Sequence, residues 1–178
     1  MKKHSLILAL FTAVALNTAA WAATQQFVIS LEPEGGEGRT GSGAGTLTFD
    51  DALNTLTFND ILWSGLSAPA NNAHIHGPSG PFPETAGVIY DLIGPGYTAI
   101  GDTSGTISGT LSLVEGQAGI SLTDQLQQLQ DGEWYINIHS TAFTGGEIRG
   151  HILIPEPSTW ALLGLGTAVI GWRLRRRA

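Results

Sequence analysis

The segment Thr46-Leu47-Thr48-Phe49-Asp50 is followed nine residues later by a near-copy, Thr55-Leu56-Thr57-Phe58-Asn59. In both segments apolar and polar side chains alternate strictly, and this period of two is typical of a strand with one buried face. The leucines and phenylalanines fall on one face and the threonines on the other. Because aspartate and asparagine favour turns, residues 51–54 between the segments predict a turn, and the stretch as a whole predicts an antiparallel hairpin.

Further strand-like segments lie on both sides of this hairpin. They cover residues 27–31, 60–66, 73–76, 87–92, 106–113, 134–140 and 147–154. One helix is predicted over residues 121–130, where Leu122, Leu126 and Leu129 share a face. The glycine-rich segment 35–45 predicts either a mobile loop or an edge strand broken by glycine. We expect seven or eight strands from these segments, and together with glycine-rich turns and one short helix they indicate an all-β fold, an antiparallel sandwich or barrel.

The N-terminus has the pattern of a secretory signal peptide. Lys2 and Lys3 precede an apolar run over residues 6–16, and Ala20-Trp21-Ala22 follows as a small-residue cleavage site. A permanent membrane anchor is the alternative, but a span needs about 20 apolar residues. We therefore expect export by the Sec machinery and removal of residues 1–22.

The C-terminus, residues 155–178, has three parts in order. It begins with Pro155, Glu156 and Pro157, continues with an apolar stretch over residues 160–172, and ends in the cluster Arg173, Arg175, Arg176 and Arg177. Because flanking arginines can extend a short span, the stretch predicts a thin transmembrane helix with its basic end in the cytoplasm. The alternative is a core helix with a solvated basic tail.

The triplet, apolar helix and terminal arginines together resemble the PEP-CTERM sorting signal. The resemblance implies that an exosortase in the inner membrane recognises the tail and cuts near the triplet. It also implies a Gram-negative host, transient anchoring in the inner membrane, and delivery to the cell surface or the extracellular medium. The resemblance thus implies that residues 155–178 are a sorting signal and that the mature protein carries no membrane anchor.

Composition excludes several classes of protein. The chain has no cysteine, which excludes disulfides, thiolate metal sites and cysteine nucleophiles. Residues 23–154 hold two basic side chains, Arg39 and Arg149, against 14 acidic ones, a net charge of −12. Such a domain disfavours nucleic acid, and it disfavours anionic polysaccharide unless divalent cations bridge the two. No phosphate-binding loop, nucleophile elbow or dinucleotide fingerprint is present, so we expect that the protein is not an enzyme.

Three histidines on two predicted strands are candidate metal ligands. His74 and His76 flank Ile75, so their side chains leave the same face of a strand roughly 6.5–7 Å apart. His139 lies on the polar face of its own strand. Three imidazoles suit an open zinc or copper site, with redox activity as one option for copper.

A polar network without any ligand is the alternative explanation of the same residues. Here His139 or His76 donates to Glu147, and Arg149 bridges to Glu147 or a neighbouring carboxylate, so that Glu147 and Arg149 form a structural clasp. His151 is expected to be an ordinary strand residue.

Three segments resemble the CHRD (chordin-type) domain over residues 26–154. They are Ala73-His74-Ile75-His76-Gly77-Pro78, Gly132–Ser140 and Gly145-Gly146-Glu147-Ile148-Arg149-Gly150. The resemblance implies an extracellular β-domain with no assigned biochemical activity. The expected plan is a signal peptide (1–22), a CHRD-like β-domain (23–154) and a sorting segment (155–178). His-x-His on a β-strand also faintly resembles copper–zinc superoxide dismutases, so the sandwich is expected to be immunoglobulin-like or superoxide-dismutase-like.

Three functions are compatible with these observations. The first is a non-catalytic structural or binding role at the cell surface or in the matrix, with extracellular polysaccharide or surface proteins as partners and no cofactor. The second is binding of copper or zinc by His74, His76 and His139. The third is adhesion or carbohydrate binding through exposed aromatic side chains, namely Phe82, Tyr90 and Tyr97.

Overall fold

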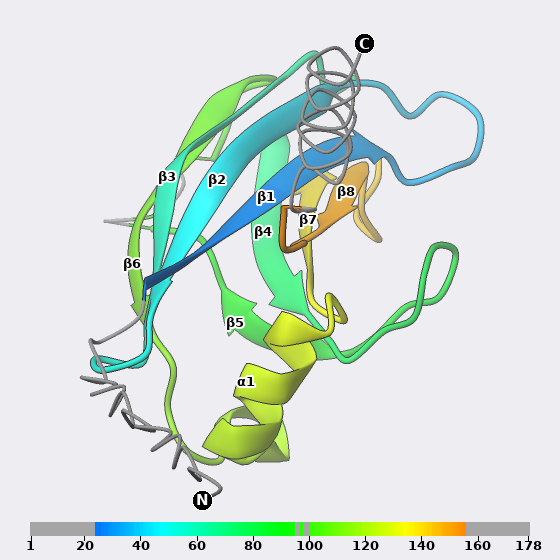
Figure 1. The fold of residues 1–178 in the computed structure, drawn as a ribbon. Helices are drawn as coiled ribbons and strands as arrows, with labels where there is room; N and C mark the ends of the chain where they lie inside the picture. The colour runs from blue at the N-terminus through cyan, green and yellow to red at the C-terminus, as the bar shows by residue number, and fades with distance from the viewer. Residues whose placement is uncertain (1–23, 95–96, 98–99, 156–178) are drawn as a thin grey trace, which may run out of the picture.

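The computed structural model describes residues 24–94, 97 and 100–155 (Figure 1). The strands are β1 (Thr24–Pro33), β2 (Ser42–Asp50), β3 (Thr55–Ser64), β4 (Ala70–His76), β5 (Val88–Asp91), β6 (Gly105–Ser112), β7 (Tyr135–Ser140) and β8 (Ile148–His151). A 3₁₀ turn, η1 (Gln117–Gly119), precedes the helix α1 (Leu122–Gln130). The expected signal peptide and the sorting segment beyond Pro155 lie outside the described residues. Among the described residues, no helix has the length and apolar character to cross a membrane.

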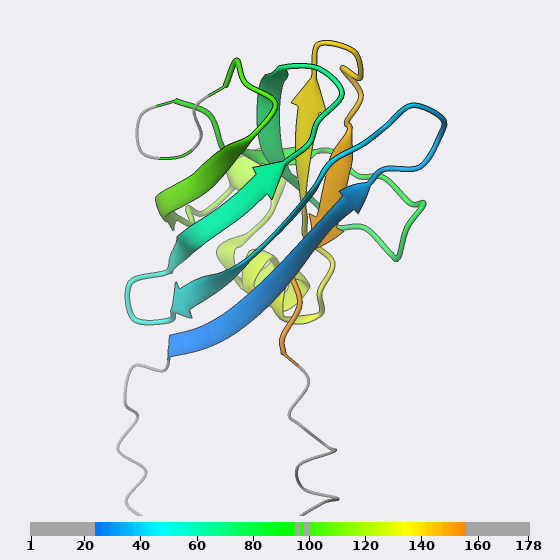
Figure 2. The same cartoon turned by 90° about the horizontal axis from the view of Figure 1, so that it is seen from above.

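All eight strands belong to one antiparallel sheet in the order β5-β4-β7-β8-β1-β2-β3-β6. Figures 1 and 2 show that this sheet curls into a half-barrel. The long strand β1 joins the two halves, because it pairs with β2 over residues 24–31 and with β8 only through Glu32 and Pro33. The prediction of an all-β antiparallel fold with one short helix is confirmed.

The predicted hairpin is formed by β2 and β3. Leu47 lies opposite Phe58 and Phe49 opposite Leu56, and all four side chains are buried. The residues predicted as a separate strand over 60–66 instead continue β3 as far as Ser64, so that prediction was wrong. The pairing shifts between Phe58 and Ile61, where Asp60 adopts a φ of 50°. This bulge adds one residue and returns Ile61 to the core face, which simple alternation would have turned outward.

The glycines of β2 lie in the interior of the sheet, because β2 pairs with β1 on one side and β3 on the other. The prediction of a broken edge strand for this segment was therefore wrong. A Cβ atom on Gly45 would stand 2.7 Å from the Cα of Ile61. Glycine at this position thus lets β2 approach the bulged part of β3.

Helix α1 lies at one end of the curled sheet, next to β5 (Figure 1). Ser121 caps it by accepting a hydrogen bond from the amide of Asp124. On its buried face, Gln125 accepts a 2.7 Å hydrogen bond from the Tyr90 hydroxyl, which itself accepts one from the amide of Val114. These bonds connect β5 with the segment after β6, and β5 and β6 are the two edge strands of the sheet. Tyr90 is therefore buried, and the prediction of an exposed aromatic there was wrong.

The two ends of the described chain leave the domain side by side (Figure 2). Val28 in β1 and Leu153 exchange two backbone hydrogen bonds of 2.8 and 3.0 Å. Pro155, the first residue of the expected sorting motif, therefore follows within two residues of a segment fixed to β1.

Candidate metal centre

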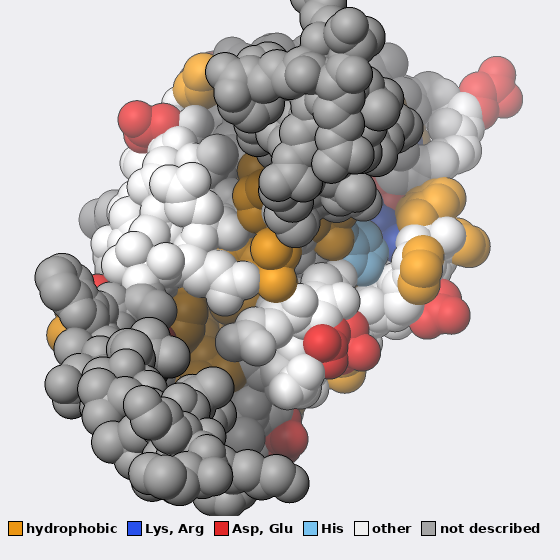
Figure 3. All heavy atoms as spheres, in the orientation of Figure 1, with side chains coloured by type: hydrophobic (Ala, Val, Ile, Leu, Met, Phe, Trp, Pro, Cys, Tyr) orange, Lys and Arg blue, Asp and Glu red, His pale blue; other side chains and the backbone are white. Residues whose placement is uncertain are grey.

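The candidate site lies on the outer face of β4, β7 and β8. Alternation turns Ile75 and Ile136 into the core, and their neighbours turn outward. The register then places Asp91, His74, Asn137 and Arg149 in one row across four strands. The outer face of a sheet is usually solvated, yet His76, His139, Asn137 and Arg149 are buried here. Figure 3, which shows one face of the molecule, has a small histidine surface and a small arginine surface beside hydrophobic side chains.

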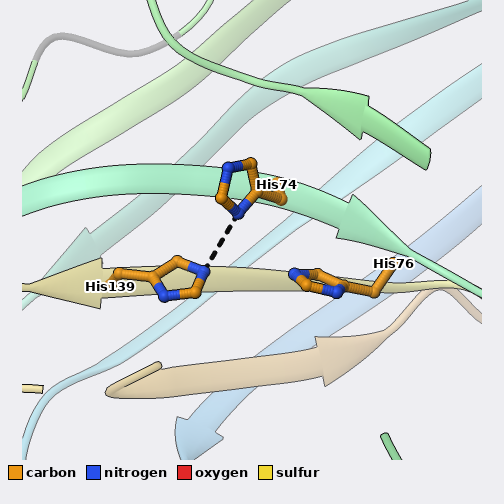
Figure 4. A group of neighbouring side chains, drawn as sticks. All are labelled: His74, His76 and His139. Carbon is orange, nitrogen blue, oxygen red and sulfur yellow. Dashed lines mark hydrogen bonds between the residues drawn. The ribbon is translucent and has the colours of Figure 1, made fainter. Parts of the chain in front are cut away.

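The structure brings the three predicted histidines together. One ring nitrogen from each of His74, His76 and His139 lies within 4.8 Å of the other two, and Figure 4 shows these nitrogens facing one another. The closest approach is 3.1 Å, between His74 Nδ1 and His139 Nε2. Zinc–nitrogen bonds of about 2.0–2.1 Å place two tetrahedral ligands about 3.4 Å apart. The His74–His139 contact, a hydrogen bond in this structure, is thus close to the spacing of two ligands of one ion, and the nitrogen of His76 lies within 4.8 Å of both.

The electrostatic environment keeps two of these rings neutral. Burial lowers the pKa of His74, and His139 and His76 lower it further, against a smaller opposite effect of Asp91. Burial also lowers the pKa of His76, partly offset by its hydrogen bond to the backbone of Ala86. Metals bind the neutral imidazole, so lowered pKa values favour binding at neutral pH.

The nitrogens that face away from the cluster have oxygen partners. His76 Nδ1 lies 2.9 Å from the carbonyl oxygen of Ala86, and His139 Nδ1 lies 2.9 Å from that of Thr144. His74 Nε2 lies 3.2 Å from the Asp91 carboxylate. The inward nitrogen of His76, Nε2, is buried and has no hydrogen-bond partner among the described residues. With its Nδ1 directed at Ala86, His76 turns Nε2 toward the cluster as an acceptor.

Of the two partners predicted for Arg149, Glu147 or a neighbouring carboxylate, the structure shows the second, Glu34. The Arg149 guanidinium pairs with Glu34 at 3.3 Å and donates to the carbonyl oxygen of Glu84 at 2.8 Å. It also lies over the rings of Phe82 and Tyr135, at 4.7 and 4.5 Å from their centroids. The expected ion pair between Arg149 and Glu147 is not formed. Through these contacts Arg149 fixes two loops to the sheet, the loop after β1 by way of Glu34 and the loop between β4 and β5 by way of Glu84.

Glu147 is fully buried and holds loops by a different route. Its Oε1 atom accepts hydrogen bonds from the amides of Ser67, at 2.6 Å, and Thr40, at 3.3 Å. Burial raises the pKa of this carboxyl. Hydrogen bonds from Ser140, Ser67 and Thr40 together have a larger, opposite effect, so the pKa lies below its ordinary value. Neither His139 nor His76 donates to Glu147, so that part of the expected polar network was wrong.

Two residues of the site were missed in the sequence, Glu34 and Asp91. Asp91 ends β5 and Glu34 follows β1, and no motif marks either residue. His151, in contrast, lies apart from the cluster as expected, with Nδ1 2.8 Å from the carbonyl oxygen of Gly132. Of the two remaining predicted aromatics, Phe82 is 54% exposed, whereas Tyr97 is half-buried edge-on against Phe58.

The fold and the site define a small all-β domain that holds a cluster of three histidines beneath its surface loops. The chain belongs to the CHRD family, since the model of the CHRD domain matches residues 19–152. The PEP-CTERM protein-sorting motif matches residues 153–177, and this motif marks an exosortase-sorted bacterial protein destined for the cell surface or the extracellular medium. No curated protein and no solved structure matches the chain.

Proposed function

We propose that this protein is a non-catalytic surface domain that binds one copper or zinc ion through His74, His76 and His139. The observation that carries the proposal is the convergence of three ring nitrogens within 4.8 Å of one another. Three histidines with an open fourth position form a common donor set for zinc, and imidazole also suits copper.

A purely structural network leaves one buried polar atom of the cluster unpaired among the described residues. A buried polar atom without a partner costs about 1–3 kcal/mol, and His76 Nε2 is such an atom. A bound ion removes this cost, because it takes the lone pair of His76 Nε2 together with those of the other two rings. The oxygen partners on the far side of each ring support this reading, since metal-binding histidines almost always donate their second N–H to an oxygen.

The first test measures the metal content of the purified protein. We expect about one zinc or copper ion per chain, retained through dialysis against buffer. Both His74→Ala and His139→Ala are expected to weaken affinity by more than the roughly 10–100-fold that results from losing a hydrogen-bond partner of a ligand. Elemental analysis gives the stoichiometry, and titration against a competing chelator gives the affinity.

His151→Ala is the matched control, because it removes an imidazole from the same sheet face but outside the cluster. Its affinity should equal that of the wild type. Metal content well below one ion per chain, or equal losses in all three variants, would show that the cluster does not hold an ion.

The second part of the proposal concerns processing. We propose that an exosortase cuts the chain near Pro155, so that the mature domain leaves the inner membrane without residues 156–178. Two epitope tags test this, one placed before Pro155 and one after Arg177. In mature surface or medium fractions we expect only the first tag, and a strain without exosortase should retain both on one polypeptide. Co-migration of the two tags in mature fractions would contradict processing.

A further inference from the structure

His76 and His139 are both fixed in one tautomer by the backbone. In each ring, Nδ1 lies 2.9 Å from a carbonyl oxygen, that of Ala86 for His76 and that of Thr144 for His139. A carbonyl oxygen only accepts hydrogen bonds, so Nδ1 carries the hydrogen in both rings and Nε2 carries the lone pair. Both rings therefore present Nε2 to the space that the three histidines share.

His74 has the opposite arrangement. Its Nε2 lies 3.2 Å from Oδ1 of Asp91, and its Nδ1 lies 3.1 Å from His139 Nε2. The two contacts compete for the single ring hydrogen of a neutral His74. A hydrogen on Nδ1 makes the hydrogen bond to His139 Nε2 but leaves the lone pair of Nε2 facing the Asp91 carboxylate. A hydrogen on Nε2 faces Asp91 but leaves two lone pairs opposed across 3.1 Å. A metal ion bound by His74 Nδ1 and His139 Nε2 removes this conflict, because the hydrogen then stays on Nε2, toward Asp91.

Building on the metal site proposed above, we propose that Asp91 is a positioning residue of that site. Its carboxylate turns the ring of His74 so that this ring binds the ion through Nδ1, whereas His76 and His139 bind through Nε2. The donor set is thus mixed, with one Nδ1 and two Nε2 atoms.

The position of Asp91 in the fold fits this role. Asp91 is the last residue of β5, the edge strand of the sheet, and stands directly opposite His74 in the register. On the other side of His74, the amide of Asn137 donates to Glu34 and leaves the His74 ring to Asp91. A carboxylate that accepts from a ligand histidine fixes the ring orientation and raises the basicity of the ligand nitrogen.

Asp91 contributes to the site without being needed for the fold. Its side chain is 71% exposed, and an exposed pair of this kind adds little to stability. Removing the carboxylate should therefore leave the metal-free protein folded, with an unchanged unfolding temperature. Any loss of metal affinity then reports on the orientation of His74 rather than on unfolding.

The experiment uses the whole chain with isotope-labelled histidine, loaded with zinc alone. Long-range proton–nitrogen NMR correlations identify the protonated and the metal-bound nitrogen of each ring. In the wild type we expect His74 to bind zinc through Nδ1, and His76 and His139 through Nε2. Asp91→Ala should weaken zinc binding about 10–100-fold and remove the Nδ1-bound signature of His74. Asp91→Asn should restore part of the affinity, because an amide oxygen at this position still presents an acceptor to His74 Nε2.

Asp51→Ala is the matched control, since it removes the same charge from an exposed turn between β2 and β3. It should leave both the affinity and the spectrum unchanged. Zinc bound through Nε2 of His74, or an affinity unaffected by Asp91→Ala, would overturn the role of Asp91 while the metal site itself stands. A wild-type chain that binds no zinc or copper would instead overturn the proposed function.

Discussion

Replacing Arg149 with methionine is expected to lower the free energy of unfolding by about 3–5 kcal/mol, the usual cost of removing one partner from a buried ion pair. Arg149 and Glu34 are 4% and 12% exposed, so the carboxylate left behind would lack both its partner and most of its water. The carbonyl oxygen of Glu84 would lose its donor as well. Methionine preserves much of the packing against Phe82 and Tyr135, so the loss reports mainly on charge and hydrogen bonding. Urea unfolding at pH 7 measures it.

Arg39→Met is the matched control for Arg149→Met. Arg39 also lies over a phenylalanine ring and donates to two backbone carbonyls, but among the described residues it forms no ion pair. Its replacement should cost about 1–2 kcal/mol. Adding Glu34→Gln to Arg149→Met should recover part of the stability, because it removes the unpaired charge. If Arg149→Met costs no more than Arg39→Met, the ion pair is not a main support of the two loops.

The parts of this fold that could be predicted from the sequence are those that follow from local periodicity. The hairpin of β2 and β3 and the capped helix α1 are visible as runs of period two and period 3.6. The same reasoning grouped His74, His76 and His139, because alternation determines which face each side chain takes and the outer faces of neighbouring strands coincide.

The parts that could not be predicted depend on which strands become neighbours. Arg149 and Glu34 are separated by 115 positions and meet only because β8 pairs with the end of β1. Asp91 reaches His74 only because β5 adds to the edge of the sheet beside β4. Both residues appear in the sequence as ordinary acidic residues near strand ends, so no local pattern marks them as partners.

The bulge at Asp60 shows a second limit of pattern reading. One extra residue reverses the alternation from Ile61 onward, so a single continuous strand appears in the sequence as two. The choice of partner for Arg149 also could not be predicted from alternation, which places Glu147 on the same face, whereas the structure pairs Arg149 with Glu34. Glu147 instead accepts hydrogen bonds from the backbone amides of Ser67 and Thr40.

Glu147→Ala is expected to destabilise the domain by about 3–5 kcal/mol. The change removes the charged acceptor of the backbone amides of Ser67 and Thr40, and a hydrogen bond to a charged group contributes about 1.5–3 kcal/mol. It also leaves a cavity at a position that is 0% exposed. Glu147→Gln keeps an acceptor oxygen and the volume but loses the charge, so its cost should be smaller, about 2 kcal/mol. Chemical denaturation of the three proteins at pH 7 measures these differences.

The cost of Glu147→Gln should depend on pH, because only the wild-type side chain titrates. The pKa of Glu147 in the folded protein lies below its ordinary value of 4.5, so the ionised carboxylate stabilises the folded state. That contribution is fully present above about pH 4.5 and is lost as the pH falls through the folded-state pKa. The two stability curves should therefore converge in acid. Glu37→Gln, an equal loss of charge at an exposed position in the loop between β1 and β2, controls for net charge. A wild-type advantage that persists undiminished at pH 2 would mean that shape, and not the carboxylate charge, holds these loops.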